Sequence, residues 1–278
     1  MTTVVGTVAA LHRYPVKSMQ GEALDAVEVG PGGIVGDRSW ALRDIETGRV
    51  VSAKRPRPWG AALACTATGL DDEVQIELPS GERFGIHDGG LSVALEAVFG
   101  RTVATERWTP GEQPSYDSEW PEVDGVSLSG DLALPTNLTG EGVGFVDLGE
   151  LHLLTTASMR TVAEADPELS VDVRRFRPSV LIDTGDATGF PENDDWAGAT
   201  LRIGTGDDAV EVAVGEPAPR CIMTTLAQGD LPRQPGVLRT IARINPRESD
   251  FGSFACLGAY ATVARPGTVR AGDVVTIV

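Results

Sequence analysis

Cys221 is the residue of this sequence whose neighbours are best suited to chemistry. It lies in the segment Pro-Ala-Pro-Arg-Cys-Ile-Met-Thr-Thr, residues 217–225, directly after an apolar, β-branched run. A neighbouring guanidinium, here that of Arg220, favours the thiolate form of a cysteine, which attacks electrophiles and binds soft metals. Two hydroxyls, Thr224 and Thr225, follow the thiol. The alternative interpretation is an ordinary buried cysteine beside the end of a strand.

The other two cysteines, Cys65 and Cys256, lie in apolar stretches and are predicted to be core residues. Three scattered cysteines are typical of a reduced protein with free thiols, so we expect a cytoplasmic location. The three histidines lie near neither a cysteine nor one another in the sequence. A zinc site of the usual spacing is therefore not expected.

Basic residues gather in three further segments, each at the expected entry to a strand. These segments are Tyr-Pro-Val-Lys-Ser at 14–18, Gly-Asp-Arg-Ser-Trp at 36–40 and Arg-Arg-Phe-Arg-Pro-Ser at 174–179. Arginine binds phosphate through two parallel hydrogen bonds and lysine binds it as a point charge, so the segments suggest an anion pocket. The alternative is that each cation pairs with one of the 40 acidic residues.

The overall charge excludes several classes of partner. Lysine and arginine total 23 against 40 acids, a formal net charge of −17 over 278 residues. Nucleic-acid binding requires a basic footprint that this chain lacks, and its charge also argues against anionic membrane surfaces. No run of about 18 apolar residues predicts a membrane helix, and the first residues do not resemble a secretory signal.

Short strands separated by glycine-rich turns predict a mainly β fold with a few helices, in the β-barrel class. A hairpin is expected from 39–44 and 49–52 around a turn at 46–48, and helices are expected over 92–99 and 157–165, with a helix end at 241–244. Further strands are expected over 4–11, 62–68, 74–78, 83–86, 103–106, 151–154, 179–183, 200–203, 210–214, 259–264 and 274–278.

The composition changes between residues 107 and 125, where three prolines and two tryptophans occur among acids. Such a stretch is typical of a loop or linker. We therefore predict a domain over 1–109, a linker over 110–127 and a second domain over 128–278.

Taken together, these motifs resemble the MOSC domain family. The segments at 14–18 and 36–40 resemble the N-terminal β-barrel domain that precedes MOSC domains. Phe-Arg-Pro at 176–178, Asp-Trp at 195–196, the cysteine segment and Pro-Gly-Thr-Val-Arg-Ala-Gly-Asp at 266–273 resemble the MOSC domain itself. The resemblance implies a β-barrel-like N-terminal domain followed by a β-barrel MOSC domain. MOSC domains form the C-terminal part of molybdenum cofactor sulfurases and also the mitochondrial amidoxime reducing component.

The resemblance implies a molybdenum-pterin cofactor (molybdopterin) with Cys221 as both the metal ligand and the catalytic residue. Lys17, Ser18 and Arg38 correspond to residues that contact the phosphate end of the pterin. The full set of cofactor-binding residues that it implies is Lys17, Ser18, Arg38, Thr155, Ser158, Arg177, Arg220, Thr224 and Thr225.

The activity implied by the resemblance is a molybdenum-dependent oxidoreductase that reduces small N-hydroxylated or N-oxide compounds. One alternative is a sulfur carrier of the cofactor-sulfurase type, with a persulfide on Cys221. Another is a non-catalytic cofactor-binding module. Full-length sulfurases carry an upstream domain that uses pyridoxal phosphate, and this chain has no room for that domain and only two lysines. Covalently bound pyridoxal phosphate is therefore not expected.

Such a reductase needs a supply of electrons. Neither a flavin nor a nicotinamide fingerprint is present, and three dispersed cysteines are too few for an iron–sulfur cluster. We expect a separate electron-transfer protein, ferredoxin-like or a flavin reductase, to dock near the mouth of the cofactor site. Because small ferredoxins are usually acidic, the docking surface should be less acidic than the rest of the chain. Neither a nucleic acid nor a membrane is expected as a partner.

Overall fold

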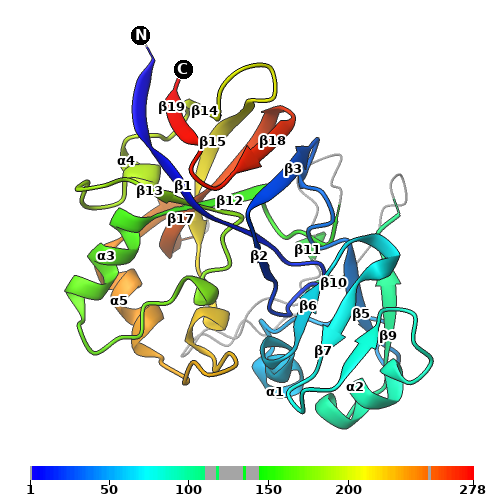
Figure 1. The fold of residues 1–278 in the computed structure, drawn as a ribbon. Helices are drawn as coiled ribbons and strands as arrows, with labels where there is room; N and C mark the ends of the chain where they lie inside the picture. Colours follow the sequence, from blue (N-terminus) through cyan, green and yellow to red (C-terminus); the bar gives the residue numbers. More distant parts are fainter. Residues whose placement is uncertain (1, 110–116, 119–133, 136–143, 250–251) are drawn as a thin grey trace.

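The computed structural model describes residues 2–109, 117–118, 134–135, 144–249 and 252–278. Figure 1 shows two lobes, a larger one that carries both ends of the chain and a smaller one built from the segment between β5 and β9. The predicted linker at 110–127 lies outside the described residues except for Asp117–Ser118, which forms strand β10 and pairs with β11, Leu134–Pro135.

The larger lobe is a closed barrel of seven strands. Neighbouring β12 and β13 run parallel, whereas the other neighbouring pairs around the ring are antiparallel. Closure leaves no free edge within the ring. In order around the ring the strands are β12 (Leu151–Thr155), β13 (Val180–Asp183), β1 (Thr3–Arg13), β19 (Val274–Ile277), β14 (Thr200–Ile203), β15 (Val210–Pro219) and β17 (Gly252–Arg265), which pairs back to β12.

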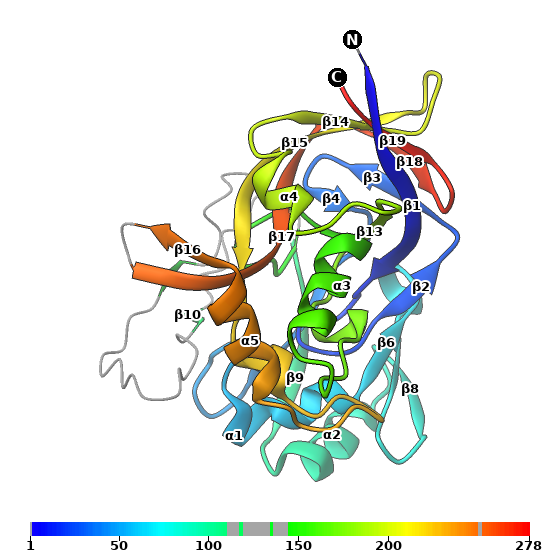
Figure 2. The same cartoon turned by 90° about the vertical axis from the view of Figure 1, so that its left-hand side faces the viewer.

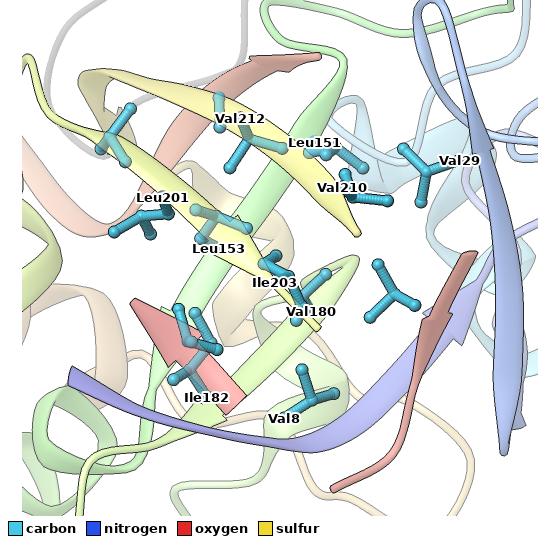
Figure 3. Close-up of a cluster of buried hydrophobic side chains, with 14 of the residues drawn as sticks. Val8, Val29, Leu151, Leu153, Val180, Ile182, Leu201, Ile203, Val210 and Val212 are labelled. Atoms are coloured by element: carbon cyan, nitrogen blue, oxygen red, sulfur yellow. The ribbon is translucent and has the colours of Figure 1, made fainter. Parts of the chain in front are cut away.

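Branched aliphatic side chains fill the barrel. Figure 3 shows them meeting from the surrounding strands; labelled there are Val8, Val29, Leu151, Leu153, Val180, Ile182, Leu201, Ile203, Val210 and Val212. A small sheet packs against this core and contributes Val27, Val29, Ile34 and Val269. It consists of β3 (Ala26–Gly30), β4 (Gly33–Ile34) and β18 (Gly267–Arg270). Strands from both ends of the chain therefore share one core.

The smaller lobe has its own core, which includes Trp40, Leu42, Ile76 and Leu95. Its strands are the pair β5 (Trp40–Asp44) and β9 (Val103–Arg107) and the meander β6 (Thr66–Thr68), β7 (Gln75–Glu77) and β8 (Arg83–Gly85). Its helices are α1 (Pro56–Trp59), α2 (Leu91–Phe99) and two 3₁₀ turns at Gly60–Ala64 and Asp71–Glu73.

Helices also cover one side of the barrel, where they form a third apolar cluster with residues such as Val162, Phe176 and Ile241 (Figure 2). They are α3 (Thr156–Ala165), α4 (Pro191–Asp194), α5 (Gly236–Ile244) and two 3₁₀ turns at Val173–Arg175 and Ile222–Thr225. Two further strands extend the barrel strands: β2 (Glu22–Leu24) pairs with β1, and β16 (Pro246–Ser249) pairs with β17. Among the described residues, no helix is both long and apolar enough to span a membrane.

The mainly β fold class is confirmed, and a closed barrel is present. The expected hairpin between 39–44 and 49–52 is present only in a short form: the Asp44 N–H donates to the Arg49 carbonyl at 2.9 Å, the Val51 N–H donates to the Leu42 carbonyl at 2.7 Å, and Arg43 and Val50 form an isolated antiparallel bridge. Along its other edge β5 pairs over its whole length with β9, which the sequence did not predict. The strand expected at 62–68 begins as a 3₁₀ turn and is extended only over β6. Apolar composition alone does not distinguish a buried 3₁₀ turn from a buried strand, because both kinds of segment are rich in apolar residues.

Candidate active site

Strained backbone marks three of the predicted site residues. Ser18, Arg38 and Arg177 have positive φ angles of 69°, 49° and 55°, and the remaining non-glycine residue of this kind in the described chain is Asp71. A residue with a Cβ pays about 1–3 kcal/mol for this left-handed conformation, which persists where the surrounding structure imposes it and clusters at functional sites. Left-handed backbone at a non-glycine residue therefore occurs in three segments that are far apart in the sequence, and in each it marks a predicted site residue.

Tyr14 brings two of these residues together. Two guanidinium groups lie near its ring, that of Arg38 at 5.2 Å and that of Arg177 at 4.2 Å from the ring centroid. The Tyr14 hydroxyl donates a hydrogen bond to the carbonyl of Pro178 at 3.2 Å, which ties the N-terminal segment to the Phe-Arg-Pro segment. All three predicted basic segments therefore meet in space.

Arg177 is a buried cation whose hydrogen-bond acceptor is a backbone carbonyl and not a carboxylate. Its side chain donates to the Met19 carbonyl, while the neighbouring Arg38 is paired with the buried carboxylate of Asp37. Burial, followed by the charge of Arg38, lowers the pKa of Arg177 to about 10. An anion bound here would stabilise both charges.

Lys17 and Lys54, the two lysines of the chain, share one counter-ion. Asp147 accepts from Lys17 Nζ at 2.7 Å through Oδ1 and from Lys54 Nζ at 2.8 Å through Oδ2. Burial, together with Lys54 and Arg38, lowers the pKa of Lys17 to about 8, although Asp147 opposes this change. Despite burial, the two lysines hold the pKa of Asp147 well below its usual range.

Lys54 links this ion cluster to the cysteine. Burial opposes the charge on Lys54, yet Asp147 and then Cys221 raise its pKa, so the sulfur lies within electrostatic reach of the ammonium group. Ser18 Oγ accepts from the backbone N–H of Ala53 at 3.1 Å, which fixes the segment just before Lys54.

Cys221 is partly exposed and begins the 3₁₀ turn Ile222–Thr225, directly after β15. The two threonine hydroxyls stabilise this turn: Thr224 donates to the Cys221 carbonyl at 3.0 Å and Thr225 to the Ile222 carbonyl at 2.7 Å. Both threonines are buried. In this structure the pair shapes the turn that presents the thiol.

Arg220 is the polar neighbour of the thiol. Its Nη2 donates to the Phe176 carbonyl at 2.7 Å, and its Nη1 lies 3.3 Å from His152 Nε2. Within the described part of the chain its buried Nε has no hydrogen-bond partner. Buried donors are rarely left unsatisfied, so this one fits a site that accepts a further group.

His152 is neutral here. Burial, and then the charge of Arg220, lowers its pKa to about 3. Nε2 faces both the Leu257 carbonyl at 3.2 Å and Arg220, while Nδ1 faces the Arg177 carbonyl at 3.4 Å. A neutral ring carries one N–H: on Nδ1 it donates to the Arg177 carbonyl and leaves Nε2 to accept from Arg220, whereas on Nε2 it donates to the Leu257 carbonyl.

The structure thus brings together eight sequence-predicted residues, the last two through the cysteine turn: Lys17, Ser18, Arg38, Arg177, Arg220, Cys221, Thr224 and Thr225. Sequence reasoning missed Lys54, Asp147 and His152. The scarcity of lysine is a signal that could have pointed to Lys54. Asp147 is one acid among 40, and no spacing marks it.

Thr155 and Ser158 have different partners. Their hydroxyls donate to the buried carboxylate of Glu192, at 2.7 Å from Thr155 and 2.5 Å from Ser158. Both side chains are fully buried, and Thr155 also caps α3 by accepting from the Ser158 N–H. In the described part of the chain neither residue contacts Arg38, Arg177 or Cys221, and their cofactor role remains a prediction.

Fold and site together define a β-barrel protein with a cation-rich site around a single partly exposed cysteine. A family model described as "MOSC domain" matches residues 142–276, and one described as "MOSC N-terminal beta barrel domain" matches residues 5–93. The chain belongs to the MOSC domain family. The second match includes β1, which lies in the seven-stranded barrel between two C-terminal strands.

Curated relatives are similar over most of the chain. The "Mitochondrial amidoxime reducing component 2" of Homo sapiens is 29% identical over 294 residues, covering 97% of this chain and 82% of the relative. The "Molybdenum cofactor sulfurase" of Drosophila grimshawi is 26% identical over 253 residues, covering 87% of this chain but 31% of that protein. Among solved structures, the YUAD protein from Bacillus subtilis aligns over 100% of this chain and 96% of its own, with 14% identity and a TM-score of 0.46.

Proposed function

We propose that this protein is a molybdenum-cofactor oxidoreductase that reduces N-hydroxylated or N-oxide compounds, with Cys221 as the protein's ligand to the metal. The observation that carries the proposal is the convergence of three strained residues, Ser18, Arg38 and Arg177, with the turn that presents Cys221. The similarity to amidoxime reducing components over 97% of the chain supports the choice of reaction.

The charge of the site fits a cofactor with an anionic tail. Among the described residues, the site contains five cations and two carboxylates: Asp37 pairs with Arg38 and Asp147 pairs with both lysines, while Arg177 lies against Tyr14 and Arg220 beside His152. The excess of positive charge and the unsatisfied Nε of Arg220 leave room for an anionic group.

We assign the phosphate end of a molybdenum-pterin cofactor to Lys17, Ser18, Arg38 and Arg177. Cys221 would supply the thiolate that such a metal accepts as a soft ligand. When bound, the cofactor supplies a centre that exchanges two electrons and an oxygen atom, while the protein binds and orients it. His152 and Arg220 would fix the groups around the thiol.

The reaction balances with an external reductant. An N-hydroxylated compound takes up two electrons and two protons; its N–O bond breaks, and the products are the parent amine or amidine and one water molecule. A separate electron-transfer protein, ferredoxin-like or a flavin reductase, would supply the electrons. The partly exposed Cys221 marks the place where the small substrate would enter.

The test is turnover of an N-hydroxylated amidine by cofactor-loaded protein. We expect turnover with an artificial low-potential dye and none with NADH alone. The variant Cys221→Ala should lose this activity, whereas Cys65→Ala should keep it because Cys65 is buried in the smaller lobe. Full activity of Cys221→Ala would show that the proposal is wrong.

A second candidate is a sulfur carrier with a persulfide on Cys221. Two observations favour it: the partial exposure of the thiol beside Lys54 and the similarity to a cofactor sulfurase over 87% of the chain. Cyanide-labile sulfur without molybdenum in the purified protein would support this candidate over the reductase. Stoichiometric molybdenum without turnover would instead support a non-catalytic cofactor-binding module.

A further inference from the structure

One segment of the chain departs sharply from its acidic composition. Between Glu46 and Asp71 the sequence contains no acidic residue, although 40 of the 278 residues are Asp or Glu. The same segment carries four cations, Arg49, Lys54, Arg55 and Arg57. The segment itself is therefore positive in a sequence whose net charge is −17.

This charge reaches the surface around α1. Arg55 and Arg57 are exposed, and Arg49 and Arg55 line a hollow of about 140 Å³ together with Arg101. Arg101 lies 5.7 Å from the ring of Trp59 and pairs with the buried carboxylate of Asp44 at 2.8 Å and the exposed one of Glu46 at 2.7 Å. We call the four arginines 49, 55, 57 and 101 the basic patch.

The basic patch is continuous with the site. Arg55 directly follows Lys54, whose ammonium group is bonded to Asp147 and lies within electrostatic reach of Cys221. Ala53 packs with Leu226 and with Ile222 of the cysteine turn. In Figure 2, α1 lies below α5, on the side of the smaller lobe that faces the barrel helices.

We propose that the basic patch docks the acidic surface of a small electron-transfer protein and so places the donor beside the site. This inference rests on the proposed reductase function. An acidic carrier would be repelled by most of this molecule, so a local positive surface next to the cysteine turn both attracts the carrier and orients it. Each reduction of an N–O bond consumes two electrons and two protons and releases one water molecule, so two molecules of a one-electron carrier dock in succession and each leaves oxidised by one electron.

The test compares two electron donors for one substrate. Cofactor-loaded protein reduces an N-hydroxylated amidine either with a chemically reduced, acidic [2Fe–2S] ferredoxin or with a low-potential dye. The double variant Arg55→Glu with Arg57→Glu should lower the ferredoxin-supported rate at low salt by at least about tenfold, because charges at the rim of an interface govern association. The dye-supported rate should be unchanged.

A matched control changes the net charge equally, elsewhere on the surface. The control is the double variant Arg83→Glu with Arg270→Glu, which changes two exposed arginines. Arg83 belongs to β8, which lies away from α1 in Figure 2, and Arg270 belongs to β18, which lies away from α1 in Figure 1. This control should retain most of the ferredoxin-supported rate. In 1 M salt, where the Debye length is about 3 Å, the difference between the two double variants should largely disappear.

Each result decides between two conclusions. If wild-type protein takes electrons from the dye but not from the ferredoxin, or if the two double variants lose the same rate, the basic patch is not the docking surface. If the dye also fails with loaded wild-type protein, the proposed reductase function itself is wrong.

Discussion

At the scale of single residues, the three cysteines should differ in reactivity. Burial raises the pKa of Cys65 to about 11 and that of Cys256 to about 11, so both thiols should stay protonated at pH 8, whereas Cys221 is partly exposed. Iodoacetamide should add once to the native protein and not at all to native Cys221→Ala, as read by intact mass. Labelling of Cys65 or Cys256 in the folded Cys221→Ala protein would contradict the assignment of the reactive thiol.

Lys17 should make anion binding depend on pH. Its pKa of about 8 lies below the ordinary value of 10.5, so the side chain loses its charge as pH rises through about 8. Affinity for sulfate, whose own charge is constant in this range, should therefore fall between pH 7 and pH 9. A charge-assisted contact contributes about 1.5–3 kcal/mol, and the charged fraction of Lys17 falls about tenfold across this range, so the affinity should fall roughly five- to tenfold. Calorimetric titration would measure it.

The matched variant is Lys17→Arg, which stays charged throughout this range. Its affinity for sulfate should be nearly constant between pH 7 and pH 9. If this variant shows the same fall as the wild type, Lys17 is not the titrating group.

The sequence predicted individual site residues better than their contacts. Arg38, Arg177 and Cys221 could be found because each lies in a recognisable motif. Asp147 could not, since it is separated from Lys17 by 130 positions and acts only where folding places it between two lysines. Thr155 and Ser158 are predicted only from the family resemblance, which implies a hydroxyl residue in this strand-to-helix turn. Their hydrogen bonds to Glu192, 34–37 positions away, depend on the fold and could not be read from the sequence.

At the scale of elements, Arg175 holds the cysteine turn from its buried side. The guanidinium is fully buried and donates to four carbonyls, those of Ser170, Thr224, Leu226 and Pro232. Arg175→Met would leave these acceptors unsatisfied, so we expect a loss of roughly 3 kcal/mol or more in the free energy of unfolding. Urea unfolding measures the loss, and hydrogen exchange should show the opening of residues 221–226.

The neighbouring Arg174 provides the control. Its side chain is 41% exposed and pairs with Asp172 and Asp230 at the surface. Exposed ion pairs contribute about 0–1 kcal/mol, so Arg174→Ala should change stability little. A larger cost for Arg174→Ala than for Arg175→Met would contradict this account of the turn.

Element types were predictable where a strong local signal exists. The α2 helix ends at Gly100, whose left-handed φ of 67° stops the helix as expected, and β7 and β8 form the predicted hairpin around Gly81. The pairing of β5 with β9 was missed because nearly the whole sequence of the smaller lobe lies between these two strands, which are neighbours only in the fold. Strand partners are a tertiary property, and local alternation of residues does not encode them.

At the scale of the whole molecule, the barrel needs both ends of the chain. β1 lies between β13 and β19, and Val8 and Leu11 belong to the barrel core. A fragment of residues 128–278 lacks this strand, so we expect it not to unfold cooperatively when expressed alone. Thermal unfolding followed by circular dichroism would test this, with the full chain as the reference. A cooperative transition in the fragment would instead support the domain division at residues 110–127 as one between independent folding units.

The most direct measurement of the central claim is the molybdenum content of the purified chain and of matched variants. Protein produced in a host that makes the pterin cofactor should contain close to one molybdenum per chain by elemental analysis. Losing a charge-assisted contact costs about 1.5–3 kcal/mol, so Arg38→Gln and Arg177→Gln should each lower that content several-fold. The surface variant Arg83→Gln should leave it unchanged. Wild-type protein without molybdenum that instead releases one equivalent of sulfur with cyanide would contradict the claim that this site holds the metal cofactor.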